Sequence, residues 1–137
     1  MDESITQEHG LGCGVACIAF VTKLPYRQVV ALMGALEART KGFSPKRMNA
    51  ALEALNYAYT RNYLNPQLVP LINREGVIVF IKRSARHPKG HYLVHHRGQW
   101  MDPWINFLAD IRDISSAQSG YHAKLPGTPI YALFPKE

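Results

Sequence analysis

The segment from Gln7 to Cys17 contains the residues of this chain with the clearest capacity for chemistry. It reads Gln-Glu-His-Gly-Leu-Gly-Cys-Gly-Val-Ala-Cys, which places a glycine-flanked thiol, Cys13, at the start of an apolar stretch. A cysteine reacts as its thiolate, and a helix N-terminus or a neighbouring imidazolium stabilises that anion. The two flanking glycines would also leave the sulfur open to a substrate backbone. This pattern predicts that Cys13 is a nucleophile.

Candidate partners for this nucleophile lie far downstream. Gly90 precedes His91 and gives it room, and Asp102 precedes a proline. A thiol, a histidine that exchanges its proton and a carboxylate that orients the histidine together make a catalytic triad. Gln7 has a side-chain amide that could donate to the oxyanion of a tetrahedral intermediate. We therefore predict Cys13, His91, Asp102 and Gln7 as the catalytic set.

The main competing chemistry for these side chains is zinc binding. Cys13, Cys17, His91 and His95 would make a Cys2His2 ligand set. Cys17, however, lies one turn deeper in an apolar helix, whereas structural zinc sites draw their cysteine pairs from tight turns. We therefore expect Cys17 in the core and neither a metal nor another cofactor. His9, in a glycine-rich loop, is expected at the surface or facing a substrate.

Hydrophobic periodicity divides the chain into a helical first half and a stranded second half. We expect helices over 13–22, 25–36 and 45–55, the last with Ser44 as its N-cap and Pro45 in its first turn. Strands are expected over 57–63, 77–81, 91–96, 100–101 and 130–134, with short helical turns over 66–72 and 106–111. Helices followed by strands indicate an α+β fold, in which the helical half packs on an antiparallel sheet.

Composition and charge restrict the class of protein. The 137 residues are 47% hydrophobic and 19% charged, as in one globular domain spanning 1–137 without a linker or repeat. No apolar run is long enough to span a membrane, and the acidic N-terminus lacks the layout of a signal peptide, so we expect a cytoplasmic location. The net charge of +6 comes largely from basic residues within 23–47 and 82–97. These basic segments fit a solvated surface or an acidic partner, and no recognisable motif supports nucleic acid.

Taken together, these motifs resemble the bacteriocin-processing, double-glycine peptidases. That family is papain-like and is most often fused to peptide-exporting ABC transporters. The resemblance covers nearly the whole chain and rests on Gln7 with Cys-Gly-Val-Ala-Cys at 13–17, Thr-Lys-Gly-Phe-Ser at 40–44, Gly-His-Tyr-Leu-Val at 90–94, and Asp102 with Pro103. It implies a papain-like fold with Cys13 as nucleophile, His91 as base and then acid, Asp102 as the residue that orients His91, and Gln7 as oxyanion donor.

The resemblance implies a bacterial cysteine peptidase that acts on a peptide or protein substrate, with a double-glycine leader as one candidate. No transporter segment follows the domain within these 137 residues, so we expect a stand-alone enzyme whose transporter, if it has one, is a separate protein. Two alternatives remain open. The same triad could carry out deamidation or acyl transfer, or the domain could be a non-catalytic binding module whose basic cleft holds an acidic peptide or nucleic acid.

Overall fold

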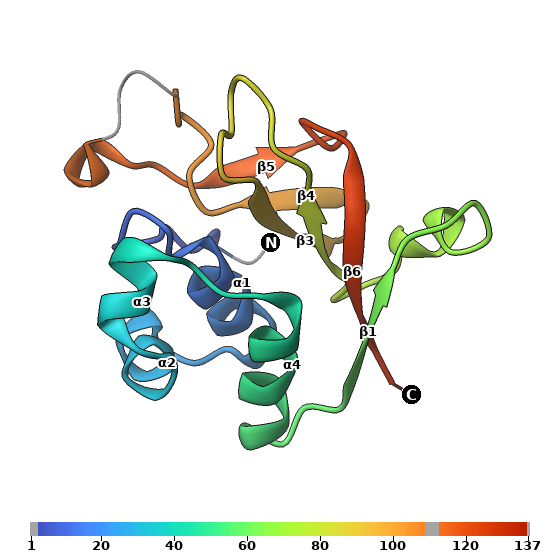
Figure 1. Ribbon diagram of the computed structural model, residues 1–137, viewed down its shortest axis with the longest axis horizontal. Coiled ribbons are helices and arrows are strands. Elements are labelled where there is room, and N and C mark those ends of the chain that lie inside the picture. Colours follow the sequence, from blue (N-terminus) through green and yellow to red (C-terminus); the bar gives the residue numbers. More distant parts are fainter. Residues whose placement is uncertain (1–2, 109–112, 137) are drawn as a thin grey trace.

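The computed structural model describes residues 3–108 and 113–136, and the helices of that part form one layer of the molecule (Figure 1). They are α1 (Cys13–Thr22), α2 (Tyr26–Met33), α3 (Ala35–Thr40) and α4 (Pro45–Ala54). Helix α1 is apolar on all sides and is buried along most of its length, as expected for a helix without a polar face. None of the helices in the described ranges is long and apolar enough to cross a membrane.

The start of α4 was predicted correctly and the end of α2 was not. The Ser44 hydroxyl accepts a hydrogen bond from the backbone N–H of Arg47 at 3.1 Å and caps α4. The helix expected over 25–36 instead ends at Met33, because Gly34 has a φ of 118°, which an α-helix cannot contain. Leu36 consequently belongs to α3 and is 61% exposed rather than buried.

The second half of the chain forms one antiparallel sheet. In the described residues its strands are β1 (Tyr59–Tyr63), β2 (Ile78–Ile81), β3 (His91–His96), β4 (Gln99–Asp102), β5 (Gly120–His122) and β6 (Pro129–Pro135). Their spatial order is β1-β6-β2-β3-β4-β5, and all neighbours are antiparallel. The predicted α+β class and five of these strands are confirmed, whereas β5 was not predicted. Two short 3-10 helices, η1 (Val69–Ile72) and η2 (Ile114–Ser116), lie in the connections, and the helical turn expected over 106–111 extends into 109–112, outside the described residues.

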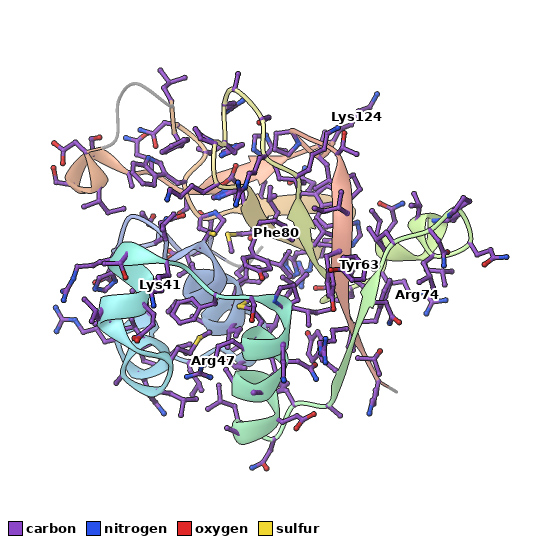
Figure 2. The ribbon with its side chains drawn as sticks, in the orientation of Figure 1. Lys41, Arg47, Tyr63, Arg74, Phe80 and Lys124 are labelled. Atoms are coloured by element: carbon purple, nitrogen blue, oxygen red, sulfur yellow. The ribbon has the colours of Figure 1, made fainter. Side chains whose placement is uncertain are left out.

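Apolar side chains pack on both faces of the sheet. The helices cover one face, where α1 packs directly against β3. Phe80 of β2 lies in the centre of the molecule on this side, and its ring packs on that of Tyr92 at a centroid distance of 4.8 Å (Figure 2). A second cluster on the opposite face includes Val79, Leu93 and Trp100. Strand β3 is therefore buried on both faces, which gives its N-terminal residue, His91, a rigid support.

Candidate active site

Cys13 is the first residue of α1, and its glycine neighbours serve close packing. A Cβ atom at Gly14 would lie 2.6 Å from the sulfur of Met48, and one at Gly12 would collide with the hydroxyl of Tyr26. The structural role of both glycines is thus to let α1 approach its neighbours, not to provide the substrate access that we expected. Cys13 itself is 9% exposed and lines a pocket of about 300 Å³.

His91 connects Cys13 to Asp102. The Nε2 atom of His91 lies 2.6 Å from Oδ1 of Asp102, and the Cys13 side chain lies near enough to interact with the imidazole. Because Nε2 faces the carboxylate, Nδ1 is the ring nitrogen that remains available to exchange a proton with the thiol. Burial by itself would lower the pKa of His91, but the Asp102 carboxylate and the Cys13 side chain together raise that pKa well above its usual value. The arrangement therefore favours the imidazolium form of His91.

The position directly before His91 requires a glycine, Gly90. It has a φ of 75°, in the region that favours glycine, and a Cβ atom there would collide with the ring of Phe80. The room that we attributed to this glycine is therefore used by Phe80, and it allows the chain to turn into β3 with His91 facing Cys13.

Asp102 is fully buried and has a second histidine partner that the sequence did not suggest. Its Oδ2 atom lies 2.7 Å from Nε2 of His122, on β5, and its Oδ1 accepts from the backbone N–H of Trp104 at 2.9 Å. Burial would raise the pKa of Asp102, but the charge of His91 and the hydrogen bonds from His122, His91 and Trp104 lower it. Asp102 is consequently a carboxylate, and each of its oxygens accepts at least one hydrogen bond.

Gln7 lines the same pocket as Cys13, and three hydrogen bonds hold it there. Its backbone N–H donates to the carbonyl of Pro103 at 3.2 Å, which ties the N-terminal segment to the turn after Asp102. Its side-chain Nε2 donates to the carbonyls of His9 at 3.0 Å and Gly10 at 3.3 Å. The amide thus belongs to the same pocket as the thiol, but its hydrogens are directed to backbone carbonyls in this state.

A second unpredicted residue, His87, lies against the catalytic histidine candidate. Its ring stacks on His91 with a centroid distance of 4.5 Å and an interplanar angle of 5°, and Phe107 stacks on it at 5.4 Å. Burial, followed by the nearby charge of His91, lowers the pKa of His87 to about 4. His87 is therefore a neutral aromatic ring that covers the imidazolium, an arrangement with cation–π character.

The pocket beside Cys13 has an apolar wall and a cationic rim. Leu11, Trp104 and Phe107 line it together with Arg39 and Lys89, both of which are exposed. No aspartate or glutamate is among the described residues that line this pocket. The wider positive charge is dispersed, because Figure 2 places Arg74 and Lys124 well away from Lys41 and Arg47, which lie in the helical layer.

The remaining candidates of the zinc hypothesis lie apart from the thiol–imidazole pair. Cys17 is completely buried in α1, and burial raises its pKa well above the usual value, as expected for a core thiol. His95 packs edge-on against Trp100, at a centroid distance of 4.9 Å. Within residues 3–108 and 113–136, no three histidine, cysteine or acidic side chains are grouped so that they could hold a metal ion.

His9 is used structurally. Its Nδ1 lies 2.9 Å from the hydroxyl of Tyr26, and the two rings stack at 5.7 Å. His9 is half-buried in this contact and is not among the residues that line the pocket. His9 is therefore partly at the surface, as expected, and its contact with Tyr26 secures the loop before Cys13 to α2.

Comparison with known proteins adds evidence on the fold. No family model and no curated protein sequence matches this chain. Among solved structures, the chain is similar to the peptidase domain of Streptococcus ComA, a bi-functional ABC transporter involved in a quorum-sensing pathway. The TM-score is 0.57 at 16% sequence identity, and the alignment covers 96% of this chain and 95% of that domain. The protein therefore shares the papain-like α+β fold of that domain.

Proposed function

We propose that this protein is a cysteine peptidase in which Cys13, His91 and Asp102 form the catalytic triad. The observation that carries the proposal is the continuous chain of contacts from Cys13 through His91 to the buried Asp102. Cys13 and His91 line a pocket, in a fold shared with a peptidase domain. Fold alone does not imply activity, so the argument depends on this local geometry.

In the proposed reaction, the Cys13 thiolate attacks the carbonyl carbon of a peptide bond and forms a tetrahedral intermediate. The imidazolium of His91 then gives its proton to the leaving amine nitrogen, and a thioester with Cys13 remains. The neutral His91 next removes a proton from water, which attacks the thioester and releases the acid. Asp102 orients the ring throughout and stabilises its charged form without taking the proton itself.

The oxyanion of each tetrahedral intermediate needs donors on the side of Cys13. We propose the backbone N–H of Cys13, which is a free helix N-terminal group, and the side-chain amide of Gln7. Of the two hydrogen bonds made by the Gln7 amide, the one to Gly10 is the longer. This hydrogen is the one that would turn toward the oxyanion when negative charge develops.

The pocket supports a peptide substrate with an acidic residue close to the bond that is cleaved. Arg39 and Lys89 offer two exposed positive charges beside an apolar wall, and the described lining contains no opposing acid. Complementary charge at such a rim increases the rate of encounter and excludes basic sequences. Since the similar ComA domain belongs to an ABC transporter, a peptide exported by a transporter is the first substrate class that we would test.

A mixture of peptides derived from a bacterial proteome tests the proposed activity. The protein, or its Cys13→Ala variant, is incubated with the mixture, and the new termini are identified by mass spectrometry. Cleavage by the native protein only, with a thioester trapped on Cys13, would support a peptidase. Conversion of side-chain amides to acids without new termini would identify a deamidase, and binding without either change would identify a binding module.

The cationic rim can be tested without a known substrate. Iodoacetate and iodoacetamide alkylate thiolates in the same way but differ in charge, so the ratio of their rates reports the potential at Cys13. Arg39→Gln with Lys89→Gln should lower the iodoacetate to iodoacetamide ratio by about fivefold at low salt, since an exposed charge pair contributes about 1 kcal/mol. Arg74→Gln with Lys124→Gln makes the same change of net charge outside the pocket and should leave the ratio unchanged. Equal effects of the two double variants would argue against a subsite that binds an acidic residue of the substrate.

A further inference from the structure

The carboxylate of Asp102 is shared between two histidines from different strands. His91 on β3 contacts Oδ1 at 2.6 Å, and His122 on β5 contacts Oδ2 at 2.7 Å. Oδ1 also accepts from the backbone N–H of Trp104. Because Asp102 is fully buried and ionised, an oxygen without a donor would carry a large desolvation cost. His122 therefore satisfies the one oxygen that neither His91 nor Trp104 reaches.

Strand pairing explains how His122 reaches this position. On the β4–β5 ladder, Asp102 is opposite Gly120 and Trp100 is opposite His122. Residues two apart share a face of a strand, so His122 is the diagonal neighbour of Asp102 on the same face of the sheet. The short strand β5 is anchored next to this pair, because the Ser119 hydroxyl contacts those of Ser4 at 2.8 Å and Thr6 at 2.7 Å. The N-terminal segment that carries Gln7 thus also secures the strand that carries His122.

We propose that His122 is a positioning residue of this site: its Nε2–H holds Oδ2 of Asp102, so that Oδ1 stays directed at His91. The proposal rests on the function proposed above. Since an ionised carboxylate has no hydrogen to give, the hydrogen between His122 and Asp102 belongs to Nε2 of His122. Without this donor, Asp102 can rotate away from His91 or admit water, and either change weakens the imidazolium that stabilises the Cys13 thiolate.

Other titratable groups around the carboxylate also affect how far the Cys13 thiol and His91 form a thiolate–imidazolium pair. These groups must stay intact in the test. They are His91 on β3, Cys13 and Cys17 on α1, and His87 before β3. A substitution of His122 leaves all four in place; the hydrogen bond of His122 reaches the site through Asp102, while its charge also acts on His87. This separates His122 from residues that contact the thiol or its imidazole directly.

The experiment compares His122→Phe with His122→Gln. Phenylalanine keeps a flat ring but has no donor, whereas glutamine can place its amide nitrogen near the position of Nε2. The rate of Cys13 alkylation by iodoacetamide is measured from acidic to alkaline pH, with peptide mapping to exclude Cys17. His95→Phe is the matched control, because His95 on β3 lies opposite the same residue, Trp100 of β4, as His122 does, with its ring packed on that of Trp100.

For His122→Phe we expect the alkylation profile to move to higher pH, with a rate near pH 6 at least roughly tenfold lower, as for the loss of one hydrogen bond to a charged group. His122→Gln should restore most of the native rate, and His95→Phe should match the native profile. A native profile in His122→Phe, or an equal loss in both His122 variants, would overturn the proposal. An ordinary thiol profile in the unsubstituted protein would instead refute the proposed function, so the two failures are distinguishable.

A second measurement does not depend on any His122 variant folding. In the native protein, nitrogen-15 NMR of the histidine rings should show a hydrogen on Nε2 of His122, shifted downfield by its bond to the carboxylate. In Asp102→Asn this signal should lose its downfield shift. A native His122 ring that carries its hydrogen only on Nδ1 would contradict the proposed donor and refute the inference.

Discussion

Replacing Asp102 by asparagine tests the electrostatic basis of the proposed site. Asparagine has nearly the same shape, so Asp102→Asn removes the negative charge beside His91 while it keeps an oxygen for hydrogen bonding. The carboxylate raises the pKa of His91, so the imidazolium is present below that raised pKa and is lost as the pH rises through it. Without the carboxylate this loss moves to lower pH, and the thiolate that depends on the imidazolium becomes less populated at neutral pH.

The size of the effect follows from the contact distance. His91 Nε2 and Asp102 Oδ1 are 2.6 Å apart, which puts the centres of the two delocalised charges roughly 4 Å apart, where a unit pair at an effective dielectric of 20 interacts by about 4 kcal/mol. At about 1.4 kcal/mol per pH unit, this corresponds to nearly three units, or a change in the thiolate–imidazolium population of up to about a thousandfold. The dipole of the asparagine amide replaces part of the lost interaction with His91. We therefore expect the alkylation rate of Cys13 near pH 6 to decrease by roughly a hundredfold or more.

The assay is the pH dependence of Cys13 alkylation by iodoacetamide, with turnover measured in parallel once a substrate is known. The native protein should react rapidly well below the pH at which an ordinary thiol ionises, near 8.5. Asp102→Asn should react rapidly only toward that higher pH. Circular dichroism of both proteins checks that the fold is unchanged. If Asp102→Asn leaves both the alkylation profile and turnover as in the native protein, Asp102 is only a turn residue before Pro103, and the reasoning fails.

Three further predictions address the thiols, the oxyanion and the covering ring. Iodoacetamide at neutral pH should label Cys13 well before Cys17, because Cys17 is fully buried and burial raises its pKa. Preferential labelling of Cys17 would overturn the choice of nucleophile. Gln7→Ala should lower kcat about 10²- to 10³-fold with little change in KM, because the oxyanion exists only near the transition state; a change confined to KM would assign Gln7 to substrate binding. In the folded protein the pKa of His87 is about 4, whereas in the unfolded chain it is near 6.5. The free energy of unfolding should therefore fall, by at most about 3 kcal/mol, as the pH decreases from 6.5 to 4. Denaturant unfolding should show that His87→Phe removes this loss, and an unchanged pH dependence would refute it.

Local sequence determined most of the elements that support the site. Helix α1 follows from an uninterrupted apolar run, α4 from its Ser44 cap, and β2 from the β-branched run at 77–81. Each of these signals involves residues that are close in sequence, so periodicity and capping rules are sufficient to find them. The combination of Cys13, His91 and Asp102 was predicted from residue types and from a family resemblance, and the structure brings these three side chains together.

Tertiary structure alone decided how the carboxylate is held and how the imidazole is covered. Strand β5 has three residues, all only partly buried, so it carries no periodic signal, yet its pairing with β4 brings His122 to Asp102. His87 likewise comes from an irregular loop and reaches His91 through ring stacking. The roles of Gly12 and Gly14 depend on atoms of α2 and α4 that approach them in the folded state. Such contacts depend on strand register and on packing between distant segments, which residue type and spacing along the chain do not specify.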